Sequence, residues 1–160
     1  MNADDRTALR DLIAGSRQAA LATVEAGLPQ VSMVLYALER RAAAPPAVLI
    51  YVSGLAAHTR QMRAEPRVAL LVARPDCGET DPQALARVSL QGLAAPIPLA
   101  NPDYAAARAC YLAHLPQQAY LFDFSDFTLF RIELQAARFV GGFARAFSLD
   151  ATRLAQVLAF

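Results

Sequence analysis

The chain has 160 residues, of which 56% are hydrophobic and 18% are charged, and its formal net charge is +1 at pH 7. This composition excludes a disordered chain and suits a single domain, residues 1–160, with one sizeable hydrophobic core. The near-neutral charge, without any basic block, argues against nucleic-acid binding.

The sequence carries no pattern typical of a membrane span, a secretory signal or a zinc site. Its longest apolar run, residues 47–52, has the length of a strand rather than of a bilayer span. The N-terminal sequence MNADDRTALRDL has early acidic residues and no apolar signal core. Cys77 and Cys110 lie far apart and show no metal-ligand spacing. We therefore expect a cytoplasmic protein with two free thiols and no membrane contact.

The first half of the chain is expected to form a helix followed by strands. Apolar side chains at helical spacing, behind aspartates that cap a helix, predict a helix at residues 4–15. Dense apolar segments separated by turn-forming residues predict strands at residues 18–25, 29–39 and 47–53. A short helix at residues 55–63 follows and ends before Pro66.

The second half is expected to be mostly strand. The predicted strands are residues 67–75, 87–97, 128–134 and 137–147. Within them, Gly92 indicates a bulge or a close backbone approach. The clearest helix starts at Asn101, a good N-cap followed by Pro102, and a last helix starts near Asp150. Strands that follow one another, without alternating helices, indicate an antiparallel barrel or sheet with helices packed outside.

A polar cluster stands where the third predicted strand passes into a helix. It consists of Ser53, His58, Thr59 and Arg60. The first N–H groups of a helix are unpaired, and the helix dipole is positive there. Together with hydroxyl and guanidinium donors, they make a candidate phosphate-binding site. The alternative is that Ser53 only caps the helix while the other side chains are solvated, and the spacing leaves both interpretations open.

The second predicted strand, residues 29–39, is a candidate surface for a flat ligand. In PQVSMVLYAL, residues 29–38, both faces are apolar except at Gln30 and Ser32. A planar aromatic ligand could lie against such a strand and take hydrogen bonds from its main chain. The alternative is a strand buried on both faces.

Familiar catalytic patterns are absent from the sequence. It contains neither the glycine-rich motifs of Rossmann and P-loop nucleotide sites nor the GxSxG motif of serine hydrolases. Asp123 and Asp126 are interpreted as turn residues rather than as a catalytic carboxylate pair. No residue is therefore assigned as a general acid or base.

Four segments, in this order and spacing, resemble the pyridoxamine 5'-phosphate oxidase-like FMN-binding split barrels, and more narrowly the branch linked to heme utilisation. The segments are SRQAALATVEAGLPQVSMV (16–34), YVSGLAAHTRQMRAEPRVALLV (51–72), RVSLQGLA (87–94) and FSDFTLFRIELQAARFVGGFARAFSLD (124–150). The resemblance implies a mainly β, α+β fold: a six-stranded antiparallel split β-barrel with short peripheral helices. It also implies a homodimer with FMN bound in clefts at the subunit interface.

The resemblance further assigns flavin contacts along the chain. It implies a phosphate site at Ser53, His58, Thr59 and Arg60, a ring site at Val31, Ser32 and Met33, a polar contact at Arg87, and a contribution to the partner's cleft from Arg145. The expected function is that of a flavin-dependent oxidoreductase acting on a small molecule or heme. The alternative is a non-catalytic protein that binds or senses flavin or heme.

Two departures from the family pattern narrow this expectation. The chain has no tryptophan and lacks the basic strand motif of the vitamin B6 oxidases, so vitamin B6 oxidation is not expected. The expected domain also ends without the further C-terminal domain that heme-utilisation relatives often carry. Heme contacts from that domain, including a C-terminal histidine, are therefore not transferred to this chain.

Overall fold

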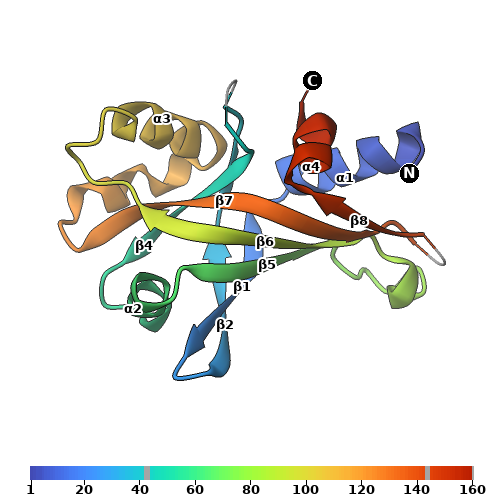
Figure 1. Ribbon diagram of the computed structural model, residues 1–160, viewed down its shortest axis with the longest axis horizontal. Coiled ribbons are helices and arrows are strands. Elements are labelled where there is room, and N and C mark those ends of the chain that lie inside the picture. Colours follow the sequence, from blue (N-terminus) through green and yellow to red (C-terminus); the bar gives the residue numbers. More distant parts are fainter. Residues whose placement is uncertain (42–43, 143–144, 160) are drawn as a thin grey trace.

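The computed structural model describes residues 1–41, 44–142 and 145–159, and within them the chain forms an eight-stranded antiparallel sheet surrounded by helices (Figure 1). The strands are β1 (Gln18–Glu25), β2 (Leu28–Leu35), β3 (Ala37–Glu39), β4 (Ala47–Ser53), β5 (Arg67–Ala73), β6 (Arg87–Pro96), β7 (Phe127–Val140) and β8 (Ala146–Asp150). The helices are α1 (Ala3–Gly15), α2 (Ala57–Ala64), α3 (Tyr104–His114) and α4 (Ala151–Leu158), with 3₁₀ turns η1 (Pro82–Ala84) and η2 (Pro116–Asp123).

The order of the strands confirms the expected split barrel. Neighbouring strands follow the order β2-β1-β5-β6-β7-β4-β3, and β8 pairs with β7. The sheet curls so that β2 also lies near β4. Alternate side chains of β6, such as Val88 and Leu90, point into the barrel, whereas Ser89 and Gln91 face outward. This alternation is the expected signature of a strand with one face in a core.

The strand count differs from the six that the resemblance implies, for two structural reasons. The predicted strand 29–39 is interrupted at Tyr36, whose buried hydroxyl donates to the Ile13 carbonyl at 2.7 Å. The predicted strands 128–134 and 137–147 are instead one long β7, followed by a separate β8. Of the expected strand 137–147, residues 143–144 lie outside the described residues.

Gly92 confirms the expected close backbone approach. The register between β6 and β7 shifts at Gln91/Gly92, so Gln135 is left without a partner in the ladder. A Cβ at position 92 would lie 2.5 Å from the Glu133 carbonyl oxygen. Only glycine fits there, and the extra residue lets β7 continue as a bulged strand instead of breaking.

Two hydrophobic clusters hold the helices in place. The first fills the barrel and continues under α1 and α4 through Leu9, Ile13 and Leu154. The second, which includes Tyr51 and Tyr111, lies under α3 and η2. Figure 1 shows α3 and η2 over one end of the sheet and α1 with α4 near the other. Across the described residues, no helix is long and apolar enough to cross a membrane.

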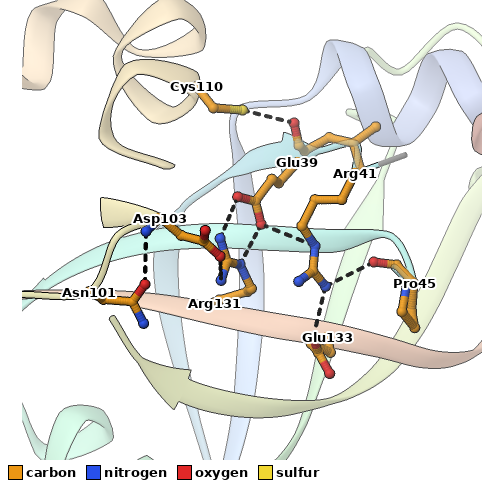
Figure 2. Close-up of polar contacts among 9 residues, drawn as sticks. Glu39, Arg41, Pro45, Asn101, Asp103, Cys110, Arg131 and Glu133 are labelled. Atoms are coloured by element: carbon orange, nitrogen blue, oxygen red, sulfur yellow. Dashed lines mark hydrogen bonds and ion pairs between the residues drawn. The ribbon is translucent and has the colours of Figure 1, made fainter. Parts of the chain in front are cut away.

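A buried ion pair ties β3 to β7 beside α3 (Figure 2). Glu39, with 8% of its side chain exposed, accepts hydrogen bonds from Arg131 Nε at 2.6 Å and Nη2 at 2.8 Å. Arg41 Nε lies 3.7 Å from the same carboxylate, and Arg41 Nη2 donates to Glu133 at 2.8 Å. The Glu39 hydrogen bonds raise the pKa of Arg131. The cluster therefore adds polar contacts that hold β3, a three-residue strand at the edge of the sheet, to β7.

Candidate functional site

The turn from β4 into α2 presents unpaired backbone donors. The N-cap of α2 is Ala56, which has no side chain able to accept a hydrogen bond, whereas Asn2 and Asp150 cap α1 and α4. Within the described residues, no acceptor reaches the N–H groups of Ala57 and His58. Free N–H groups at the positive end of the helix dipole favour an anion.

The two hydroxyl groups predicted for the phosphate site hold this turn together. Ser53 Oγ donates to Asp126 Oδ2 at 2.8 Å and accepts from the Leu55 N–H at 3.2 Å. Thr59 is buried, and its Oγ1 donates to the Ser53 carbonyl at 2.6 Å. Their hydrogen-bonding capacity is therefore directed into the turn, where it shapes the backbone that carries the free N–H groups.

Arg60 is engaged by an acidic residue from the β1–β2 hairpin. Its Nη2 and Nε lie 2.8 Å and 3.2 Å from Glu25 Oε1, and 65% of its side chain is exposed. Gln61 Nε2 donates to the other Glu25 oxygen at 3.1 Å, and the buried Thr23 hydroxyl donates to Gln61 Oε1 at 2.5 Å. These hydrogen bonds from Arg60 and Gln61 lower the pKa of Glu25. An anion at α2 would therefore compete with Glu25 for the guanidinium of Arg60.

His58 and Met33 line a common cavity. This cavity, of about 230 Å³, also includes Tyr51, Ser53 and Phe127 in its lining, and we call it the His58 cavity. Burial lowers the pKa of His58, so the neutral ring is favoured. The structure thus brings the end of β4, the start of α2 and the last three residues of β2 (Met33, Val34 and Leu35) to the same place.

The predicted ring-binding strand is an exposed apolar edge. Across the described residues, β2 pairs with β1 alone, so its other edge is unpaired. Val31 and Met33 have exposed fractions of 71% and 67%, whereas Ser32 is half-buried and points to the other face. The alternative interpretation, a strand buried on both faces, is therefore wrong for this part of the strand. Free main-chain groups and apolar side chains are available there instead.

Arg87 is the first residue of β6 and Arg145 stands directly before β8, and Figure 1 shows the starts of these two strands at the end of the sheet away from α2. Arg87 pairs with Val140 in the sheet, and its Nη1 donates to two carbonyl groups of the η1 turn at 3.2 Å. Arg145 is hydrogen-bonded to the buried Asp5 carboxylate, which lowers the pKa of Asp5. Within one copy of the chain, neither arginine joins the residues around α2.

The sequence does not predict the contacts of two carboxylates that shape the site. Asp126 is more than the expected turn residue, because its carboxylate binds Ser53 and its carbonyl accepts the Gly54 N–H at 2.5 Å. Glu25 lies 35 residues before Arg60 in the sequence. Nothing in the local pattern signals either contact, because both depend on how the sheet brings distant loops together.

The curled antiparallel sheet with helices around it places the protein in the split-barrel class. Its candidate site is the uncapped start of α2, which lies beside the exposed edge strand β2. The family comparison gives the narrower assignment. A model of the pyridoxamine 5'-phosphate oxidase family matches residues 6–141, and the chain belongs to this family.

The most similar relatives include proteins whose names concern heme. The chain is 37% identical over 121 residues to "Non-canonical heme oxygenase HOZ, chloroplastic" of Arabidopsis thaliana, a match that covers 76% of this chain and 34% of that protein. A heme binding protein from Mycobacterium smegmatis has 31% identity and a TM-score of 0.81, over 98% of this chain and 62% of that one.

A third neighbour supports the fold alone. Campylobacter jejuni ChuZ superposes with a TM-score of 0.79 at 16% identity, over 96% of this chain and 62% of that one. The resemblance to the heme-utilisation branch agrees with the two relatives above 30% identity, whose names concern heme. The chain spans about a third of the plant relative and less than two thirds of these two structures.

Proposed function

We propose that this chain is a flavoprotein that binds FMN at the turn between β4 and α2, and that it functions as an oxidoreductase related to heme-utilisation proteins. The observation that carries the proposal is the uncapped start of α2, which adjoins the His58 cavity and the free edge of β2. Membership of the pyridoxamine 5'-phosphate oxidase family supports it.

The residues present fit the two ends of FMN. The free N–H groups of Ala57 and His58 would hold the phosphate, with Arg60 joining when the phosphate displaces Glu25. Val31 and Met33 would lie along the ring, whose polar edge would meet main-chain groups of β2. FMN, when bound, supplies the redox chemistry with a small molecule or heme as substrate. The chain itself binds and orients the cofactor and keeps water from its apolar side.

The outer face of the sheet supports a homodimer. Met33 and Leu71 both lie opposite Ala20 in the sheet, and their exposed fractions are 67% and 45%. Side chains of this kind, gathered on one face, mark a contact surface. A second copy would also be the source of an arginine such as Arg145 at the flavin, since the same copy holds that side chain too far away.

Arg60→Ala tests the phosphate site. A charge-assisted contact contributes about 1.5–3 kcal/mol, and Glu25 competes for it, so FMN affinity should fall about tenfold. Arg63→Gln, on the same helix, is the matched control and should leave FMN affinity unchanged. The measurement is quenching of FMN fluorescence on titration with apoprotein. Equal affinities for wild type and Arg60→Ala would contradict the phosphate site.

The oligomeric state tests the interface separately. Light scattering after size exclusion should give a dimer for the wild type and a shift toward monomer for Met33→Glu. Gln30→Glu is the matched control, because it adds the same charge at an exposed position on the other face of the same strand. A wild type that stays monomeric at every concentration would refute the shared site.

A non-catalytic flavin- or heme-binding protein is the second candidate. One observation favours it: the described residues that line the His58 cavity include no carboxylate or amine, and the one imidazole there, His58, belongs to the proposed phosphate site. Bleaching of bound flavin by NADPH, or loss of the Soret band of added heme with a reductant, would identify an oxidoreductase. Stable spectra under both conditions would identify a binding protein.

A further inference from the structure

A second cavity lies between η2, the end of β6 and the start of β7. Its volume is about 440 Å³, and we call it the η2 cavity. Five aromatic side chains contribute to its lining: Tyr51, Tyr104, Phe122, Phe124 and Phe127. This volume lies in the range of small-molecule sites, and walls rich in rings favour a flat ligand.

Part of this aromatic wall is already held in place. The rings of Phe122 and Tyr51 are stacked, with centroids 3.8 Å apart and an interplanar angle of 2°. The guanidinium carbon of Arg108 lies 4.8 Å from the centroid of Phe122. A wall that is ordered before binding loses little conformational entropy when a ligand arrives.

The rim of the η2 cavity exposes apolar side chains to water. Leu99 has an exposed fraction of 80%, and Phe124 one of 52%. Both residues belong to the lining of the cavity. Neither contributes much to the core, so both side chains are available to contact an apolar ligand.

The charges in the lining define the polar part of the ligand. Arg63 Nη2 donates to Thr128 Oγ1 at 3.1 Å, and within the described residues the guanidinium forms no ion pair. It therefore retains donors for an anionic group. The lining also includes the carboxylate of Asp123. It would accept a hydrogen bond from a ring N–H or hydroxyl and would repel a second negative charge.

We propose that the η2 cavity binds a planar aromatic molecule with a single negative group, such as an aromatic carboxylate or sulfonate. The rings pack against the aromatic wall, and the anionic group meets Arg63. This site shares Tyr51 and Phe127 with the His58 cavity but has its own cation, so it does not depend on FMN binding.

A pair of fluorescent probes tests the site. We would titrate 8-anilinonaphthalene-1-sulfonate, an aromatic monoanion, and its uncharged analogue N-phenyl-1-naphthylamine into the wild type, with and without saturating FMN. Arg63→Gln should weaken the sulfonate about tenfold and the uncharged probe less than twofold, because only the first loses a charge-assisted contact. Arg60→Gln, the matched control on α2, should leave both affinities unchanged.

A second variant locates the probe. Leu99→Asp changes an exposed rim residue and should weaken both probes without unfolding the chain. The proposal is overturned if the sulfonate shows no saturable binding, if FMN displaces it, if Arg60→Gln weakens it as much as Arg63→Gln, or if Leu99→Asp has no effect. Failure of FMN to bind, with these probe results intact, would count against the proposed function alone.

Discussion

Replacing Arg131 by Met should destabilise the protein by about 3 kcal/mol. Arg131 makes two short hydrogen bonds to Glu39, and the exposed fractions of the two side chains are 12% and 8%. The substitution leaves Glu39 buried without this partner. Removing one partner of a buried ion pair lowers the free energy of unfolding by about 3–5 kcal/mol. We place the value at the lower end because Arg41 remains 3.7 Å from the carboxylate.

Urea unfolding followed by circular dichroism, at one fixed protein concentration, measures this change. Arg138→Met is the matched control on the same strand, since Arg138 is exposed and donates to Ser148 on the surface. That control should change the free energy of unfolding by less than about 0.5 kcal/mol. If the two variants lost similar stability, or if Arg131→Met lost less than about 1 kcal/mol, the ion pair would not hold β3 as reasoned.

Three further predictions concern the sheet and its surface. Gly92→Ala should lower the free energy of unfolding by about 3 kcal/mol in the same assay, because its Cβ would lie 2.5 Å from the Glu133 carbonyl. Tyr36→Phe should lower it by about 1 kcal/mol, as a buried 2.7 Å hydrogen bond is lost. By NMR, Glu65 should titrate near pH 2, because hydrogen bonds from Arg67 lower its pKa from 4.5 to about 2. Because the folded state lowers the pKa of Glu65, the ionised carboxylate stabilises the protein; this stabilisation is complete above pH 4.5 and disappears as the pH falls through 2. Arg67→Gln should return the titration midpoint of Glu65 toward 4.5.

Local patterns predict most elements because they report local physics. The predicted strand at residues 47–53 matches β4, since a run of apolar side chains buried on both faces needs no distant information. The break at Tyr36 is not predictable from the local pattern, because there the Tyr36 N–H and hydroxyl bond to the carbonyl groups of Arg17 and Ile13, which only the fold brings near. The continuity of β7 escapes prediction for a similar reason: the bulge opposite Gly92 keeps the strand paired where its alternation changes.

In the candidate site, too, local patterns identify the residues but not the contacts that depend on the fold. Spacing identifies the polar cluster after β4, and the structure does place Ser53 and His58 at one cavity. What spacing does not show is where each donor points. Thr59 is turned inward to a carbonyl, and Arg60 meets a carboxylate from another hairpin. The resemblance supplies the expected role of these residues, and the folded chain shows which of their groups are free to perform it.

The length of β7 sets a fixed distance across the molecule. Phe127 at its start pairs with Ser53, and Val140 at its end pairs with Arg87. Its 14 residues extend over roughly 40 Å along the strand. A single mononucleotide cannot bridge that span, so within one chain β7 keeps the turn before α2 apart from Arg87 and Arg145. The homodimer proposed above would bring both kinds of group to one ligand, because the second copy would supply the arginines that the first holds too far away.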